Sequence, residues 1–168
     1  MKAHREPRGE SSAAEPPHAL LLDALGTLVE LEPPAEHMAA ILGLRADRRL
    51  REAIGEEMRY YRSHAVEARD AASLLELRRR CAALVSAGIG REVGVEQLMA
   101  AIRFRAYDDA APALEELRRL GLRLVCVSNW DFGLGEVLAR TGLAGLLDGI
   151  VSSAEVGVAK PDPAPFRR

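Results

Sequence analysis

One short stretch near the start of the chain constrains the fold most. The apolar run Ala19–Leu22 leads directly into Asp23, and a turn with Gly26 and Thr27 follows. The run is too short for a helix and is typical of a fully buried β-strand. Asp23 is then expected at the carboxyl end of that strand, where open α/β sheets bind their ligands. A carboxylate held there is a candidate nucleophile, although an ordinary strand followed by a turn has the same pattern.

The second half of the chain alternates between helical and strand patterns. Near-continuous apolar segments over 122–127 and 149–152 are typical of strands in a parallel sheet. A short helix is predicted between them, over 134–141. Alternation of strand and helix implies right-handed crossovers and a parallel sheet. The sequence therefore predicts an α/β fold of the Rossmann-like kind.

The segment between these regions, 35–104, is predicted to contain helices only. Leu50, Ile54, Met58 and Tyr61 recur at spacings of three and four, as on one face of an amphipathic helix. A second helix is expected to begin with a capping box at Ser73–Glu76. We expect these helices to pack on one another as a small bundle. The apolar stripes fit a plain helical subdomain as well as one that closes over a site.

Two later stretches complete a pattern with the first. Val125–Asp131 contains the pair Ser128 and Asn129, and Val156–Pro163 contains Lys160. In order, the three stretches resemble motifs I, II and III of the haloacid dehalogenase-like (HAD) hydrolase superfamily. The closest resemblance is to its phosphatase-like members, which carry a helical cap after motif I.

The resemblance implies a division of the chain. A Rossmann-like HAD core with a parallel sheet is expected over 19–32 and 106–168, with an inserted helical cap over 33–105. The polar, proline-containing segment 1–18 is predicted to be a disordered tail. The implied partner is a small phosphorylated or halogenated substrate.

The resemblance also implies roles for individual residues. Asp23 is expected to attack phosphorus and form an aspartyl phosphate. Ser128, Asn129 and Thr27 are the candidate phosphate-binding residues. Lys160 is expected to neutralise the negative charge of Asp23 and the phosphate. The chemistry thus implied is phosphoric-monoester hydrolysis, which depends mainly on positioning and charge stabilisation.

Mg²⁺ is the implied cofactor, since a hard cation prefers oxygen ligands. Its expected protein ligands are the Asp23 carboxylate, the backbone carbonyl of Leu25 and an acid from motif IV. No motif IV occurs before Arg168. From this we expect the strand Ala19–Asp23 to lie at the edge of the sheet. We also expect residues 1–168 alone to bind Mg²⁺ weakly, to hydrolyse nothing and to self-associate.

Leu25 stands where the family has a second Asp, which protonates the leaving group. General acid–base catalysis typically raises the reaction rate ~10²–10⁴-fold. The absence of this Asp therefore leaves functions other than phosphatase activity open. Haloacid dehalogenases also lack the second Asp, but they usually carry a tyrosine there and need an arginine for the substrate carboxylate. Asp131 is a substitute acid or, more simply, a turn residue. A third reading is a degenerate homologue that binds a phosphorylated ligand or a protein.

Composition excludes several other classes. The formal net charge is −2, which gives no general attraction to nucleic acid or anionic membranes. Cys81 and Cys126 lie far apart, so a disulfide framework or zinc site is not expected. No apolar run reaches membrane-spanning length. We expect a cytoplasmic protein, and the sequence leaves its oligomeric state open.

Overall fold

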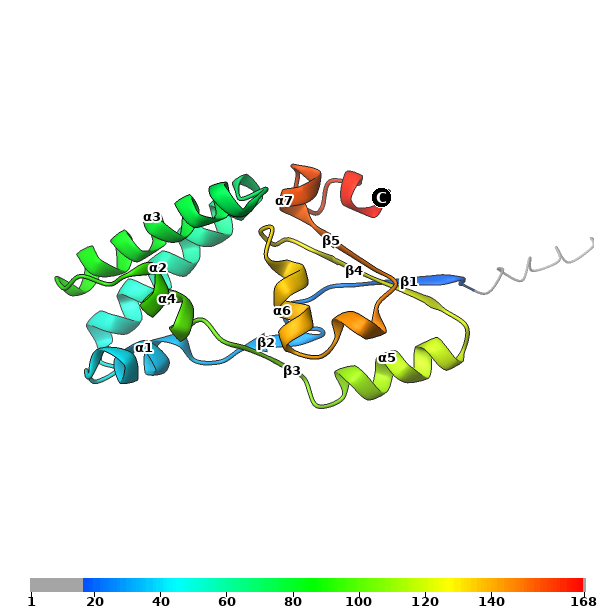
Figure 1. Cartoon of the computed structure of the whole chain (residues 1–168), viewed down its shortest axis with the longest axis horizontal. Helices are drawn as coiled ribbons and strands as arrows, with labels where there is room; N and C mark the ends of the chain where they lie inside the picture. The colour runs from blue at the N-terminus through cyan, green and yellow to red at the C-terminus, as the bar shows by residue number, and fades with distance from the viewer. Residues whose placement is uncertain (1–16, 168) are drawn as a thin grey trace, which may run out of the picture.

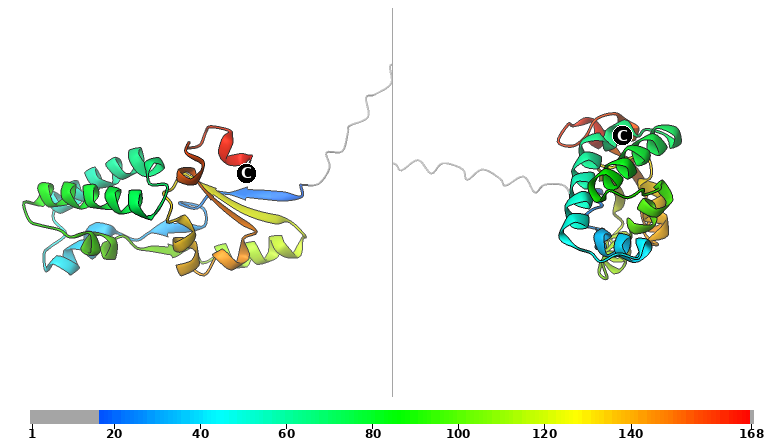
Figure 2. Two further views of the ribbon diagram at one scale, coloured as in Figure 1. Left: turned by 45° about the horizontal axis from the view of Figure 1, so that its top comes forward. Right: turned by 90° about the vertical axis from the view of Figure 1, so that its left-hand side faces the viewer.

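The structure is a computed structural model that describes residues 17–167. In Figures 1 and 2 a group of helices occupies one end of the molecule, and a parallel sheet with its covering helices occupies the other. The strands are β1 (Ala19–Leu22), β2 (Val29–Leu31), β3 (Phe104–Ala106), β4 (Arg123–Ser128) and β5 (Gly149–Ser152). The α-helices are α1 (Pro34–Leu42), α2 (Arg48–His64), α3 (Ala71–Ile89), α4 (Val95–Ala101), α5 (Ala110–Arg119), α6 (Leu134–Arg140) and α7 (Ser153–Val156). The 3₁₀ helices are η1 (Ala65–Glu67), η2 (Ala144–Leu146) and η3 (Ala164–Phe166).

The tail predicted over 1–18 lies outside the described residues, except for its last two. Within residues 17–167 no helix combines the length and the apolar character needed to cross a membrane.

The parallel sheet has the strand order β1-β4-β5. Leu22 pairs with Cys126, and Ser128 pairs with Ser152, so the carboxyl ends of the three strands meet at one edge of the sheet. The predicted α/β fold with a parallel sheet is confirmed. The apolar segments that predicted its second and third strands form β4 and β5.

β1 lies at the edge of this sheet, because within the described residues it pairs only with β4. The expected edge position is confirmed. The prediction of a fully buried strand is wrong: Leu21 is 50% exposed, whereas Leu20 and Leu22 are half-buried. Exposed and half-buried residues alternate along β1, so only one of its faces is covered.

Helices α5 and α6 pack against one face of the sheet. They bury Leu124 and Cys126 of β4 together with Leu114 of α5 and Leu138 of α6. Full burial of a leucine side chain contributes about 1.5–3 kcal/mol. This cluster therefore stabilises the position of β4, the strand that leads to the second motif, and Cys126 is part of the core.

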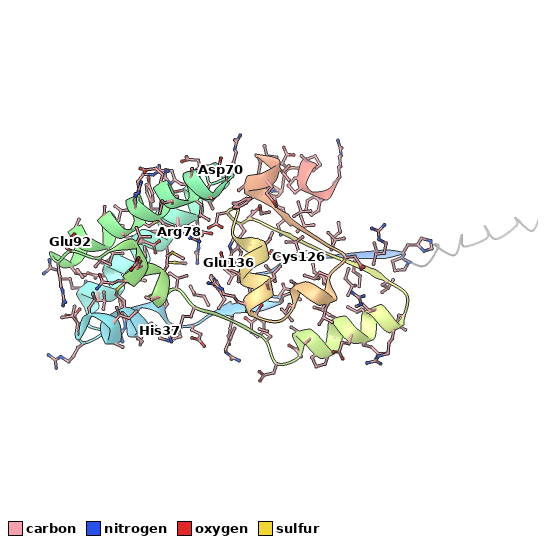
Figure 3. All side chains as sticks on the ribbon, in the orientation of Figure 1. His37, Asp70, Arg78, Glu92, Cys126 and Glu136 are labelled. Atoms are coloured by element: carbon pink, nitrogen blue, oxygen red, sulfur yellow. The ribbon has the colours of Figure 1, made fainter. Side chains whose placement is uncertain are left out.

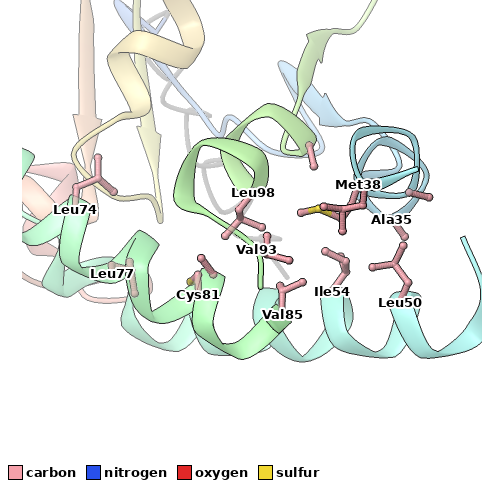
Figure 4. Close-up of a cluster of buried hydrophobic side chains, with 14 of the residues drawn as sticks. Ala35, Met38, Leu50, Ile54, Leu74, Leu77, Cys81, Val85, Val93 and Leu98 are labelled. Atoms are coloured by element: carbon pink, nitrogen blue, oxygen red, sulfur yellow. The ribbon is translucent and has the colours of Figure 1, made fainter. Parts of the chain in front are cut away.

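Helices α1 to α4, here called the helical segment, have their own apolar cluster. Figure 4 shows Met38, Ile54, Val85 and Leu98 pointing toward one another from four different helices. The capping box of α3 lies earlier than predicted. Asp70 is the N-cap and Ser73 occupies the third helical position, because the Asp70 carboxylate accepts from the Ser73 amide at 2.8 Å.

β2 and β3 form a separate two-stranded antiparallel sheet, in which Glu30 pairs with Arg105 and the two side chains form an ion pair. These strands are the two connections between the parallel sheet and the helical segment. The expectation of helices alone is therefore wrong at its end, where Phe104 begins β3. Each strand has only three residues, too few for a recognisable alternating pattern.

Candidate active site

Three segments of the chain bring predicted site residues together at the carboxyl edge of the parallel sheet. Asp23 follows β1, Ser128 ends β4, and Lys160 lies in the loop after α7. The Ser128 hydroxyl donates to Asp23 Oδ1 at 2.6 Å, and Lys160 Nζ lies 3.1 Å from the same oxygen. Residues from three separate sequence motifs thus form one cluster.

The two oxygens of the Asp23 carboxylate have different surroundings. Oδ1 also accepts a hydrogen bond of 2.8 Å from the Ala24 amide, in addition to its contacts with Ser128 and Lys160. Within residues 17–167 no donor contacts Oδ2. The carboxylate is therefore oriented through one oxygen, while the other remains available to react.

The pKa of Asp23 reflects these contacts. Partial burial raises the pKa of its carboxyl, but hydrogen bonds from Ser128, Lys160 and the Ala24 amide lower it further than burial raises it. The pKa therefore lies below its ordinary value of 3.8. Asp23 is an anion at neutral pH, as a carboxylate nucleophile must be.

Lys160 is held by both its side chain and its backbone. Its Nζ donates to the Val127 carbonyl at 2.9 Å. Asn129 binds the Lys160 backbone twice: its Oδ1 accepts from the amide at 2.7 Å, and its Nδ2 donates to the carbonyl at 3.1 Å. In the structure Asn129 therefore joins the Lys160 loop to the end of β4.

The two remaining predicted site residues, Leu25 and Thr27, lie in the turn after Asp23 and differ in their position relative to the site. Leu25 is 41% exposed and lines the cleft in front of Asp23. Thr27 is exposed and is not among the described residues that line this cleft. Gly26, between them, has a φ of 82°, a conformation that glycine adopts without strain. The turn thus brings Leu25 to the cleft and leaves Thr27 outside it.

The cleft in front of Asp23 has a volume of about 420 Å³ and lies between the sheet edge and the helical segment. This size is in the range of small-molecule sites. Tyr61 and Arg62, at the end of α2, line it from the helical side. Arg62 is exposed and is the only arginine among the described lining residues.

Asp131 lies next to this cleft and not in its described lining. Its Oδ1 accepts from the Gly133 amide at 2.6 Å, and its Oδ2 accepts from the Tyr61 hydroxyl at 3.0 Å. The side chain is 6% exposed, and this burial raises the pKa of its carboxyl despite both hydrogen bonds. The interpretation of Asp131 as a turn residue is confirmed by its hydrogen bond from the Gly133 amide. Its contact with Tyr61 links the helical segment to the second motif.

A backbone contact joins the same two regions. The Phe132 amide donates to the carbonyl of Ala68, directly after η1, at 2.9 Å. α7 also packs against η1. The helical segment is therefore in contact with the core at η1, in addition to being connected to it through β2 and β3.

The residues that the resemblance assigns to a metal are Asp23 and the carbonyl of Leu25. Within residues 17–167 no group of three or more His, Cys, Asp or Glu is arranged to hold a metal ion. Mg²⁺ usually keeps several waters and takes one or two carboxylates plus substrate phosphate. The Asp23 carboxylate and the Leu25 carbonyl are oxygen donors suited to that kind of site, which substrate phosphate and waters would complete.

The sequence did not identify Tyr61 and Arg62 as site residues. Tyr61 belongs to the apolar stripe of its helix, and Arg62 is one of many arginines in the helical segment. Neither has a local signal that separates it from its neighbours. Only the fold, which places the end of α2 against the cleft, distinguishes them.

Comparisons with known proteins agree with the geometry. A family model described as haloacid dehalogenase-like hydrolase matches residues 17–168. A Mycobacterium tuberculosis protein named phosphatase MT3486 is 38% identical over 65 residues, which are 38% of this chain and 30% of that protein. The plasmid phosphoglycolate phosphatase of Cupriavidus necator is 44% identical over 55 residues, 32% of this chain and 24% of that protein.

Among solved structures, the L-2-haloacid dehalogenase of Xanthobacter autotrophicus superposes with a TM-score of 0.65 at 24% identity. The superposition covers 89% of this chain and 62% of the dehalogenase. At this identity the likeness bears on the fold alone. The chain spans less than two thirds of the dehalogenase, and its matches span less than one third of the two curated relatives.

Proposed function

Because the chain belongs to the haloacid dehalogenase-like hydrolase family, we propose that it hydrolyses phosphoric monoesters through an aspartyl phosphate on Asp23. The observation that carries this proposal is the Asp23 carboxylate, held through Oδ1 by Ser128 and Lys160 with Oδ2 left available. The two curated relatives named as phosphatases support it.

The reaction proceeds in two displacements. Asp23 Oδ2 attacks phosphorus, and the bond from phosphorus to the leaving oxygen breaks. A water then attacks the same phosphorus, which releases inorganic phosphate and restores the carboxylate. In this proposal Lys160 offsets the negative charge of the phosphate and of the Asp23 carboxylate. The Ser128 hydroxyl, which donates to Asp23 Oδ1 in the structure, would donate to a phosphoryl oxygen instead.

The leaving oxygen must take up a proton as its bond breaks. Leu25, in the position of the family's second Asp, has no proton to give. Solvent therefore supplies this proton in the proposed reaction. Esters of acidic alcohols, whose leaving oxygen is stable without a proton, are expected to be the better substrates.

The helical segment acts as the cap in this proposal, with Tyr61 and Arg62 among the residues that it contributes to the cleft wall. Mg²⁺ is the proposed cofactor, held by the Asp23 carboxylate and the Leu25 carbonyl. When bound, it adds positive charge beside the transferring phosphoryl group. The proposed substrate is a small phosphorylated molecule, because the cleft is of small-molecule size.

Carbon–halide hydrolysis is the second candidate, and Arg62 favours it. A haloacid substrate needs a cation for its carboxylate, and Arg62 lies in the lining of the Asp23 cleft. A halide also departs without a proton, so Leu25 is no handicap to this reaction. Asp23 would displace the halide from carbon, and water would then hydrolyse the resulting ester.

The test measures two products side by side, with Mg²⁺ present. Phosphate release is followed from p-nitrophenyl phosphate, and halide release from a chlorinated short-chain acid. Where a motif IV acid is supplied together with residues 1–168 we expect phosphate release, and we expect Asp23→Asn to abolish it while the melting temperature stays the same. Residues 1–168 alone are expected to release none. Hydrolysis that survives in the folded Asp23→Asn protein would remove Asp23 from the mechanism.

Arg62→Met separates the two candidates, with Arg59→Met, an exposed arginine on the same helix, as its control. Halide release that depends on Arg62 and not on Arg59 would favour the dehalogenase. If neither product forms but phosphate raises the melting temperature, the chain is a homologue that binds a phosphorylated ligand without turnover.

A further inference from the structure

A small chamber lies beside the Asp23 cleft, between the helical segment and α6. Figure 3 shows two of its lining residues, Arg78 on α3 and Glu136 on α6, on either side of the space between these helices. The chamber has a volume of about 70 Å³. A cavity needs about 10–15 Å³ to hold one water molecule, so the chamber has room for a short polar group.

One acidic side chain in the chamber has incomplete hydrogen bonding. Glu57 of α2 is 3% exposed, and its Oε2 has no hydrogen-bond partner within the described residues. Burial raises the pKa of the Glu57 carboxyl, and a hydrogen bond with the Cys81 thiol lowers it less. A buried oxygen without a donor is unfavourable, and buried polar groups in folded proteins are normally satisfied.

The other buried carboxylate of the chamber is already satisfied. Both oxygens of Asp131 accept hydrogen bonds, from Tyr61 and from Gly133. Arg78, another lining residue, lowers the pKa of Asp131 by its charge. Of these two buried carboxylates, only that of Glu57 therefore has an oxygen, Oε2, that no donor in the described residues contacts.

The chamber and the cleft share a wall. Met58, Tyr61, Phe104 and Trp130 line both spaces. Met58 directly follows Glu57 on α2, and its unbranched thioether side chain adapts easily to a ligand. The chamber that contains Glu57 is therefore adjacent to the cleft that contains Asp23.

We propose that the chamber receives the end of the substrate remote from the reacting group, and that Glu57 Oε2 accepts a hydrogen bond from an O–H or N–H on that end. This inference rests on the proposed hydrolysis at Asp23. Leu77, Leu98 and Met99 supply apolar walls on the side of the helical segment, and the charged residues Arg78, Glu136 and Arg140 also line the chamber. The substrate class is then a small aliphatic ester with a terminal hydroxyl or amine.

The chamber is tested first without any phosphate. Small probes are added to protein labelled in its methionine methyl groups, and the resonances of Met58 and Met99 are followed. Ethanol and ethylammonium carry donors, and acetonitrile is an acceptor-only control of similar size. We expect saturable shifts with the two donors and none with acetonitrile. No saturable shift, or equal shifts with all three probes, would overturn the proposal.

Glu57→Leu removes the acceptor and keeps an apolar side chain of similar length. We expect it to weaken donor binding about tenfold, as loss of a buried hydrogen bond does. Glu56→Leu is the matched control, since Glu56 is exposed on the same helix. Equal weakening in both variants would show that the helix, and not Glu57, determines binding.

Glu57→Gln distinguishes the two kinds of donor. Its amide oxygen still accepts from a hydroxyl, so ethanol should bind as before. An ammonium loses its ionic partner, so ethylammonium should bind about tenfold more weakly. Glutamine also keeps the shape of the side chain, so this variant remains informative if Glu57→Leu does not fold.

Binding of whole esters then connects the chamber to the cleft. Calorimetry with the Asp23→Asn protein compares hydroxypropyl, aminopropyl and plain propyl phosphate. We expect about tenfold tighter binding of a donor-bearing ester, lost in Glu57→Leu. Equal affinity for all three esters would refute the chamber proposal and leave hydrolysis standing. Methionine shifts with donors but no ester binding would refute the proposed hydrolysis alone.

Discussion

The ammonium of Lys160 lies 3.1 Å from Oδ1 of Asp23, although the two residues come from opposite ends of the described chain. The same ammonium donates to the Val127 carbonyl at 2.9 Å, and Asn129 clamps the Lys160 backbone. The position of this positive charge is therefore determined by the end of β4 as well as by its own loop.

Lys160→Met removes that charge and one donor to Oδ1. The pKa of Asp23 should rise, because the hydrogen bond and the charge of Lys160 both lower it. The acidic limb of the pH–kcat/KM profile should move to higher pH. Activity should fall roughly 10²–10³-fold, as when one donor to a developing charge is removed.

Lys160→Arg is the control for this change, since it keeps the charge but alters the geometry of the donors. It should leave the acidic limb closer to that of the unmodified protein. An acidic limb that stays in place in Lys160→Met would mean that Asp23 is not the group titrating there.

Leu25→Asp should restore a proton donor next to Asp23. We expect its gain in kcat to grow with the pKa of the leaving alcohol, toward the ~10²–10⁴-fold typical of general acid catalysis. A series of aryl and alkyl phosphates measures this dependence. Leu25→Asn is the matched variant without an acidic proton. A uniform gain across the series would place residue 25 away from the leaving oxygen.

Tyr61→Phe should loosen the contact between the helical segment and the second motif. Asp131 is 6% exposed, and the change leaves its Oδ2 without the Tyr61 donor. An unsatisfied buried acceptor costs about 1–3 kcal/mol in the free energy of unfolding, which urea denaturation measures.

Tyr60→Phe serves as the control on the same helix. The Tyr60 hydroxyl accepts from Arg80 within the helical segment and does not contact Asp131. Its loss should have the smaller effect. If the double variant Tyr61→Phe/Asp131→Asn shows strictly additive losses, the two side chains are not coupled.

Glu57→Gln should flatten the dependence of stability on pH. The folded-state pKa of Glu57 is raised by burial above its ordinary value of 4.5. Its contribution to stability is therefore full below pH 4.5 and is lost as the pH rises through the folded-state pKa. The slope removed is about 1.4 kcal/mol per pH unit within that window.

Melting temperatures measured from pH 4.5 to neutral pH check this expectation. Glu56→Gln, an exposed neighbour, should keep the pH dependence of the unmodified protein. Parallel curves for Glu57→Gln and the unmodified protein would contradict the raised pKa.

The sequence predicted Asp23 from its own local pattern, because it ends an apolar run and open α/β sheets bind their ligands at the carboxyl ends of strands. Ser128 was assigned through the resemblance, and the structure brings its hydroxyl within 2.6 Å of Asp23 Oδ1. Lys160 was predicted through the resemblance alone, because its loop has no such pattern. Thr27 was also assigned to the site through the resemblance, yet it is not among the described residues that line the cleft.

Features that depend on distant neighbours were not predictable. The exposure of Leu21 depends on what covers β1, which an apolar run does not reveal. The contact between Tyr61 and Asp131 joins residues 70 apart in sequence with no shared periodicity. The burial of Glu57 could not be predicted either. Its neighbour Glu56 is the same residue type on the same helix, yet it is exposed.

The pairing of β2 with β3 has a mechanical consequence. Because the two connections to the helical segment are hydrogen-bonded to each other, they must bend and twist as one ribbon. Two-stranded ribbons are more strongly twisted than larger sheets. Motion of the helical segment relative to the parallel sheet therefore has to deform both connections together. The hydrogen bond from the Phe132 amide to the Ala68 carbonyl, directly after η1, is a further attachment that such motion has to accommodate.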